Sequence, residues 1–138
     1  MDRNSAAGME SMPGEKILIV EDDQISQKMV RDALQAGGYE TAEAESGEAA
    51  LKKVAEHTPD LILMDIRLPG IDGLETTRRL KADPQTAAIP IVAVTAHAMP
   101  EDESMIRKAG CEAYMPKPLR FSSLMSLVRN VLSGAEPA

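Results

Sequence analysis

The chain has 138 residues, of which 43% are hydrophobic and 27% charged. From this size and composition we expect one soluble globular domain without a separate effector domain. Tryptophan is absent and only one Phe and two Tyr occur, so aliphatic residues and the nine methionines must build the core. The formal charge of −7 argues against direct nucleic-acid binding, because neutralising phosphates requires clustered lysine and arginine.

The N-terminal segment, residues 1–14, is rich in Ser, Ala, Gly and Met and shows no hydrophobic period, so we expect a flexible tail. It lacks the apolar core of a signal peptide, and no segment approaches the roughly 20 apolar residues that a membrane span needs. We therefore expect a cytoplasmic protein without membrane insertion. The folded domain is predicted over residues 15–133, followed by a short C-terminal tail, residues 134–138.

Two strands and two helices are predicted in the first part of the chain. Residues 16–20 are continuously apolar and end in three acids, as a buried strand does where its end meets solvent. Residues 39–43 alternate weakly and predict an edge strand, and Ser46 can cap the helix that follows it. The helix between these strands is predicted from apolar residues at near-helical spacing: Ile25, Met29, Ala33 and Leu34.

Two further apolar runs predict buried strands in the middle of the chain. Residues 60–65 finish in the acid Asp65, and residues 89–95 finish in the hydroxyl of Thr95. A helix over residues 73–81 is predicted between them. Another helix is predicted to begin at Met99-Pro100 and to end at Gly110, since proline is tolerated in a first turn.

The last part of the chain begins with the single cysteine, Cys111, which cannot form an internal disulfide and is expected to be a small buried hydrophobe. Residues 112–115 predict a short strand that precedes Lys117-Pro118. The final helix is predicted from one apolar stripe: Phe121, Leu124, Met125, Val128, Val131 and Leu132.

Strands that alternate with helices in this way predict an α/β fold, with a parallel sheet covered by helices on both faces. In such a sheet, functional groups gather beyond the carboxyl ends of the strands. That rule selects five residues, each of which follows the last apolar residue of a predicted strand: Glu21, Asp22, Asp65, Thr95 and Lys117.

These groups together predict a site for phosphoryl transfer. Asp22 and Asp65 would repel each other unless a cation joined them, since neighbouring strands lie only about 4.8 Å apart. Oxygen ligands of this kind suit Mg²⁺, and Glu21 could add a ligand directly or through water. Lys117 supplies positive charge and Thr95 a donor hydroxyl, while a carboxylate can serve as the nucleophile that becomes an aspartyl phosphate.

Asp65 is the better candidate for the nucleophile. It is followed by a loop, residues 66–70, that can turn a backbone carbonyl toward a metal ion. Asp22 lies instead in an acidic cluster, residues 21–23, which is better suited to holding the ion.

Four motifs in this order resemble the receiver domain family of two-component response regulators. The resemblance covers about residues 15–133. The motifs are Val20-Glu-Asp-Asp23, Leu63-Met-Asp65-Ile-Arg-Leu-Pro-Gly-Ile-Asp-Gly73, Val94-Thr-Ala-His97 and Tyr114-Met-Pro-Lys-Pro118. No partner at metal-ligand spacing accompanies His97, and we expect no chemical role for it.

The resemblance implies a flavodoxin-like (βα)5 three-layer sandwich with strand order 2-1-3-4-5, and it implies a role for each matching residue. Asp65 corresponds to the phosphoacceptor, and Lys117 to the lysine that pairs with the phosphoryl oxygens. The metal, Mg²⁺ or Mn²⁺, would be held by Asp22, Asp65, the backbone carbonyl of Arg67 and, in part through water, Glu21. The phosphoryl contacts and the switch would be Thr95, the backbone of Ala96, and Tyr114, with the bond to Pro118 commonly cis.

The resemblance also implies partners. The phosphoryl group would come from a histidine kinase or a histidine phosphotransfer protein, and the output would pass through contacts with a downstream protein. Such a chain assists only its own phosphorylation and dephosphorylation, and so is a switch rather than an enzyme with turnover. The Glu-Asp-Asp start and the Thr-Ala-His-Ala stretch are similar to single-domain cell-cycle regulators of the polar-differentiation type.

Three alternatives stay open at this point. A receiver-like interaction module that is not regulated by phosphorylation would usually lack Asp22, Asp65 or Lys117. A phosphohydrolase of the haloacid-dehalogenase type would carry a second Asp two residues after its nucleophile, where this chain has Arg67. A mononucleotide-binding flavodoxin-like protein would need a glycine-rich loop after the first strand, where the acids at 21–23 would repel phosphate.

Overall fold

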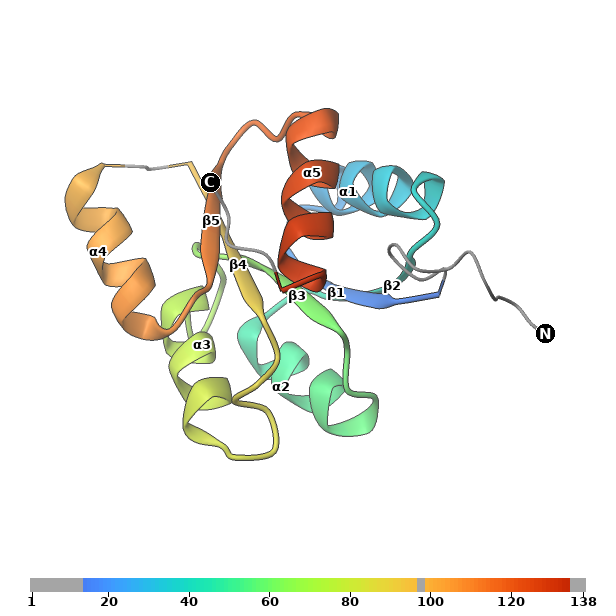
Figure 1. The fold of residues 1–138 in the computed structure, drawn as a ribbon. Helices are drawn as coiled ribbons and strands as arrows, with labels where there is room; N and C mark the ends of the chain where they lie inside the picture. The colour runs from blue at the N-terminus through green and yellow to red at the C-terminus, as the bar shows by residue number, and fades with distance from the viewer. Residues whose placement is uncertain (1–13, 97–98, 135–138) are drawn as a thin grey trace.

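The computed structural model describes residues 14–96 and 99–134, which form five strands and five helices in alternation (Figure 1). The strands are β1 Lys16–Val20, β2 Glu40–Ala44, β3 Leu61–Asp65, β4 Ile91–Thr95 and β5 Ala113–Pro116. The helices are α1 Gln24–Ala36, α2 Gly47–Glu56, α3 Gly73–Ala82, α4 Pro100–Ala109 and α5 Phe121–Leu132. The expected tails lie almost wholly outside the described residues, as does His97.

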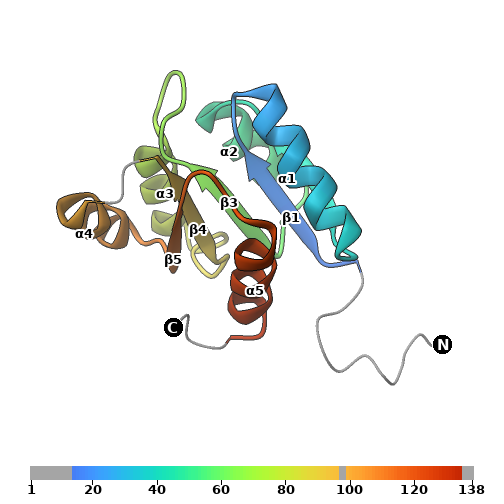
Figure 2. The same ribbon diagram turned by 90° about the horizontal axis from the view of Figure 1, so that it is seen from above.

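The sheet has the strand order β2-β1-β3-β4-β5, and every neighbouring pair is parallel, as expected. Val20 lies opposite Met64, Asp65 opposite Val94, and Thr95 opposite Pro116. The carboxyl ends of the central strands are therefore level with one another, and the loops that leave them meet at one edge of the sheet (Figure 2).

Helices cover both faces of the sheet, which confirms the predicted three-layer sandwich (Figure 1). Alternate residues of β1 serve different cores, since Ile17 and Ile19 pack under α1 and α5 whereas Leu18 and Val20 pack under α2, α3 and α4. This explains the unbroken apolar run of the sequence, because a strand buried on both faces has no polar side.

Four strands, β2, β3, β4 and β5, begin one or two residues later than predicted, and for β2 and β4 the reason lies in the backbone hydrogen bonds. The amide of Tyr39 donates to the Leu34 carbonyl at the end of α1, so β2 starts at Glu40. Pro90 has no N–H to give to the sheet, and β4 starts only at Ile91. Cys111 is buried, as expected.

The apolar stripes of two helices do not all face the core, which corrects the sequence interpretation. On α1 the buried side chains are Gln27 and Leu34, whereas Ile25 and Met29 are 73% and 66% exposed. On α5 the first apolar residue, Phe121, is 58% exposed. Helical spacing identified both helices but not the rotation of each about its own axis.

Two of the helices that follow loops at the carboxyl edge of the sheet, α1 and α3, have side-chain N-caps. The Asp23 carboxylate accepts a hydrogen bond from the Ser26 amide at 2.8 Å and caps α1, and Asp72 caps α3 in the same way through the Glu75 amide at 2.8 Å. No helix within residues 14–96 and 99–134 is both long enough and apolar enough to cross a membrane.

Candidate functional site

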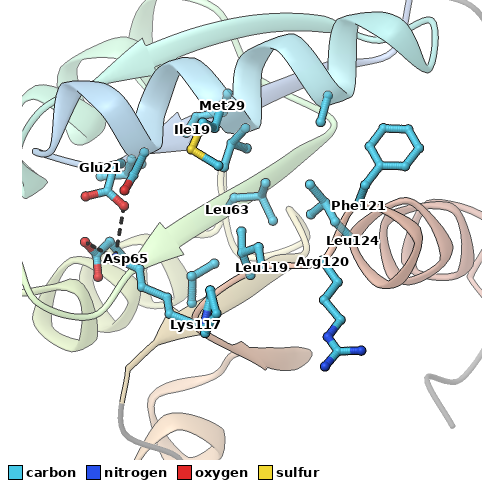
Figure 3. A pocket seen from close by; sticks show the side chains of 16 residues that line it. Ile19, Glu21, Met29, Leu63, Asp65, Lys117, Leu119, Arg120, Phe121 and Leu124 are labelled. Carbon is cyan, nitrogen blue, oxygen red and sulfur yellow. Dashed lines mark hydrogen bonds and ion pairs between the residues drawn. The ribbon is translucent and has the colours of Figure 1, made fainter.

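The strand-end residues selected from the sequence meet at the carboxyl edge of the sheet. Glu21 follows β1, Asp65 ends β3, Thr95 ends β4 and Lys117 follows β5. Figure 3 shows the Glu21 and Asp65 carboxylates side by side, with the Lys117 chain extending from the loop after β5. Four segments of the chain therefore supply one site.

Lys117 links two carboxylates. Its Nζ donates to Glu21 Oε1 at 3.1 Å and to Asp65 Oδ2 at 3.3 Å. The side chains of Glu21 and Asp65 are only 8% and 5% exposed, whereas that of Lys117 is 30% exposed. The two carboxylates are thus buried at the edge of the sheet, whereas the lysine side chain that pairs with them is partly exposed to solvent.

Burial and charge shift the protonation of this pair. Burial raises the pKa of the Glu21 carboxyl, a hydrogen bond from the Asp23 amide opposes that rise, and the negative charge of Asp65 adds to it. Burial alone would lower the pKa of the Lys117 ammonium, but its hydrogen bond to Glu21 and the charge of Asp65 raise the pKa overall. Lys117 therefore stays cationic at neutral pH, and it screens carboxylates that would otherwise repel each other.

A metal ion fits the acidic group. One oxygen each from Glu21, Asp22 and Asp65 lies within 4.8 Å of the others. Asp22 is exposed and faces water, unlike its two companions. Carboxylate oxygens in a partly open site are the ligands that Mg²⁺ accepts, because it retains several waters. The donor chemistry thus agrees with the expected Mg²⁺ or Mn²⁺, and Glu21 and Asp22 belong to the same cluster.

Glu21 is held at both its backbone and its side chain. Its amide donates to the Ala44 carbonyl at 3.0 Å, and its carbonyl accepts from Gln27 Nε2 at 3.0 Å. Its Oε2 accepts from the Asp23 amide at 3.0 Å. Gln27 was not selected from the sequence, although its spacing to Val30 and Leu34 places it on the buried face of α1.

The loop after Asp65 is anchored to the Asp65 carboxylate. The Arg67 amide donates to Asp65 Oδ1 at 3.1 Å, and the Gly73 amide donates to the Ile66 carbonyl at 2.9 Å. A Cβ on Gly73 would collide with the Asp65 carbonyl oxygen and would lie 2.8 Å from Ile66 Cα. Glycine is required there because backbone stands where a side chain would begin.

A second anchor of this loop comes from α2. The Ile71 amide donates to Glu48 Oε2 at 3.3 Å. Glu48 is another residue that the sequence did not single out, and no local pattern indicates it, because the contact joins two separate elements.

Thr95 and Tyr114 lie on the same face of neighbouring strands. Thr95 is 3% exposed, and its carbonyl accepts from the Lys117 amide at 2.8 Å. Tyr114 lies opposite Ala93, two residues before Thr95, so the two side chains point to the same face of the sheet. The Lys117–Pro118 bond is cis, as expected.

A cavity opens beside the acidic group, between α1 and α5 (Figure 3). It has a volume of about 480 Å³, and its wall is largely apolar. Asp65 and Lys117 line one end, and the exposed residues Met29 and Phe121 line the rest with neighbouring aliphatic side chains. The sequence interpretation missed this cavity, because it depends on how α1 and α5 are rotated.

Comparison with known proteins places these features in a family context. The family model described as "Response regulator receiver domain" matches residues 17–129. The "Polar-differentiation response regulator DivK" of Brucella ovis is 47% identical over 119 residues, which cover 86% of this chain and 97% of that protein. The protein of the same name from Brucella anthropi is 46% identical over the same length.

Solved structures show the same architecture. The receiver domain of the Pseudomonas aeruginosa sensor histidine kinase PA1611, which has a magnesium ion coordinated in its active-site cleft, superposes with a TM-score of 0.81 at 32% identity, covering 87% of this chain and 98% of that one. The Vibrio cholerae chemotaxis protein CheY4 superposes with a TM-score of 0.82 at 28% identity, covering 86% and 98%.

Proposed function

Because this chain belongs to the response regulator receiver domain family, we propose that it is a phosphorylation-controlled switch whose phosphoacceptor is the carboxylate of Asp65. The observation that carries the proposal is the contact of Lys117 Nζ with both Asp65 and Glu21, two members of a group of three acids that fits a divalent ion. A buried acid at a strand end would not by itself need either feature.

The proposed reaction transfers a phosphoryl group from a phosphohistidine to Asp65. A carboxylate oxygen of Asp65 forms a bond to phosphorus as the bond from phosphorus to the imidazole nitrogen breaks, and that nitrogen keeps the electron pair and takes up a proton. Lys117 is already at Asp65 and can donate to the transferred oxygens as negative charge builds up on them. Attack by water on the acyl phosphate then releases inorganic phosphate and restores the carboxylate.

We propose that Asp22, Asp65, the backbone carbonyl of Arg67 and Glu21 hold Mg²⁺ or Mn²⁺, with Glu21 in part through water. When bound, such an ion supplies positive charge to the phosphoryl oxygens. Glu21 and Asp65 are both paired with Lys117, and the contact with Glu21 would keep the ammonium in reach of Asp65.

The signal would pass from the site to the surface through Thr95 and Tyr114. A phosphoryl group adds about two negative charges at neutral pH and several acceptor oxygens. We propose that the Thr95 hydroxyl and the Ala96 amide bind those oxygens, which is supported by their position at the end of β4 and just after it, since β4 pairs with β3 at Asp65. The movement of Thr95 would vacate space for Tyr114 and so alter the face formed by α4, β5 and α5.

We propose that the phosphodonor is a histidine kinase or a histidine phosphotransfer protein in the cytoplasm, and that the output is contact with a downstream protein rather than with nucleic acid. The receiver domain would span residues 15–133. The name of the DivK relatives supports a role in polar differentiation.

The apolar cavity between α1 and α5 supports a protein donor. Asp65 is 4% exposed and lines the same cavity as Met29 and Phe121, which are 66% and 58% exposed. A donor helix that brings its phosphohistidine to Asp65 would bury these side chains, at a gain of about 25 cal/mol per Å² of apolar surface. A Met29→Glu chain should accept phosphate normally from acetyl phosphate but poorly from its protein donor.

The test is intact-mass measurement after incubation with acetyl phosphate and Mg²⁺. The wild-type chain and the control Asp60→Asn, which changes an acid at the opposite end of β3, should gain the mass of one phosphoryl group. The Asp65→Asn chain should gain none. A gain by Asp65→Asn would refute the assignment, and no gain by the wild type would favour an interaction module that is not regulated by phosphorylation.

A further inference from the structure

Tyr114 is held against α4 in a group of three side chains, whose other two members are Glu103 and Arg107 of that helix. Its hydroxyl donates to Glu103 Oε1 at 3.1 Å. The other oxygen of the same carboxylate, Oε2, accepts from Arg107 Nε at 3.3 Å. The Arg107 guanidinium carbon in turn lies 5.9 Å from the centre of the Tyr114 ring. Each member of the group therefore contacts both of the others.

The helix geometry makes this arrangement possible. Glu103 and Arg107 are one turn apart on α4 and present their side chains to the same side. Their side chains are 39% and 55% exposed, and an exposed ion pair of this kind contributes little to stability by itself. Because Glu103 also accepts a hydrogen bond from the Tyr114 hydroxyl, the ion pair can position the tyrosine side chain.

The hydroxyl stays a donor over the physiological range. The hydrogen bond to Glu103 raises the pKa of the Tyr114 phenol, burial adds to the rise, and the charge of Arg107 opposes it. Tyr114 and Thr95 share one face of the sheet, so the fastened ring stands on the same side as the hydroxyl expected to move toward a phosphoryl group.

We propose that Glu103, braced by Arg107, is a positioning residue that holds Tyr114 in its resting orientation against α4, so that this contact sets how readily the switch turns. The inference rests on the proposed function, since it takes Tyr114 as the residue that moves on phosphorylation. Glu103 and Arg107 lie outside the family motifs found in the sequence, and they touch neither the acceptor nor its metal ligands.

The consequence follows from linkage. A phosphoryl group that favours the inward position of Tyr114 must work against any contact that favours the resting position. Removing that contact should therefore raise the affinity of the chain for a phosphoryl mimic. One hydrogen bond of this type changes an equilibrium by roughly two- to tenfold.

The experiment measures binding of beryllofluoride in the presence of Mg²⁺, a stable mimic of the aspartyl phosphate, by titration followed with NMR. We expect Glu103→Ala and Tyr114→Phe each to lower the beryllofluoride concentration at half-saturation by roughly two- to tenfold. The double variant should show no more than the effect of Tyr114→Phe, because both changes remove one contact. Glu103→Gln, which keeps an acceptor oxygen, should stay closer to wild type.

Glu101→Ala is the matched control, since this residue is an exposed acid in the same first turn of α4. Damage to the fold would weaken beryllofluoride binding, so a gain in affinity cannot come from misfolding. Equal affinities for Glu103→Ala and Glu101→Ala, or additive effects in the double variant, would overturn the inference. If the wild type does not bind beryllofluoride at all, the proposed function fails instead.

Discussion

Replacing Lys117 by methionine should separate metal binding from phosphorylation, because the ammonium occupies oxygens that a divalent ion would also use. Lys117 Nζ lies 3.1 Å from Glu21 Oε1 and 3.3 Å from Asp65 Oδ2. Oxygens of both residues belong to the group in which one atom from each of three acids lies within 4.8 Å of the others. The Lys117→Met chain should therefore bind Mg²⁺ more tightly and still accept phosphate more slowly.

The size of the first effect follows from the charges. An ion in contact with the same oxygens would lie roughly 5 Å from the ammonium, where charges of +2 and +1 repel each other by about 1.7 kcal/mol at the dielectric constant of water. A lower local dielectric constant strengthens the repulsion, whereas salt and the mobility of the half-buried lysine weaken it. We expect the Kd for Mg²⁺ to fall about tenfold, equivalent to about 1.4 kcal/mol.

The second effect has the opposite sign. Without Lys117, the charge that develops on the phosphoryl oxygens loses a preorganised donor, a loss that typically costs about 100-fold or more in rate. Isothermal titration calorimetry would measure Mg²⁺ binding, and intact-mass time courses with acetyl phosphate would measure the rate. Lys117→Arg, which keeps the charge, is the control and should not gain metal affinity. Unchanged or weaker Mg²⁺ binding by Lys117→Met would show that the ammonium does not compete for these oxygens.

Three further predictions concern stability and reactivity. Because the pKa of Glu21 is raised from its ordinary value of 4.5 in the folded chain, the folded state holds more protons than the unfolded state, and ionising Glu21 costs stability as the pH rises. In EDTA, Glu21→Gln should therefore gain unfolding free energy relative to wild type as the pH rises above 4.5, and a pH-independent difference in urea melts would contradict this. Gly73→Ala should lower the free energy of unfolding by at least about 2 kcal/mol, because the new Cβ meets the backbone of Asp65. Gly37→Ala should lower it less, because only the flexible end of a methionine side chain must move. Equal urea midpoints for the two variants would refute the comparison. Burial raises the pKa of the Cys111 thiol to about 11. A thiol reagent at pH 7 should therefore modify the folded chain far more slowly than the urea-unfolded chain. Equal rates would mean that Cys111 is accessible in the folded state.

The sequence predicted which strand ends would meet, because in a parallel sheet the carboxyl ends of the strands lie at one edge. Each continuous apolar run identified a strand buried on both faces, and the residue after the run identified the carboxyl end of that strand. All such ends share one edge, so Asp65 and Lys117 were expected to meet although 117 − 65 = 52 residues separate them. The strand order could not be derived in this way and came from the resemblance to receiver domains.

The tertiary structure alone decided which atoms pair and which faces stay open. Helical spacing predicted Ile25, Met29 and Phe121 on the same apolar stripes as core residues, yet their side chains are exposed. The way a helix packs on the sheet depends on its neighbours rather than on its own residue pattern. The contact of Tyr114 with Glu103 was invisible for a related reason, since a side-chain hydrogen bond between a strand and a helix depends on distances of a few ångströms that no residue pattern contains. Sequence periodicity reports which elements form, whereas contacts between elements arise only once those elements are packed together.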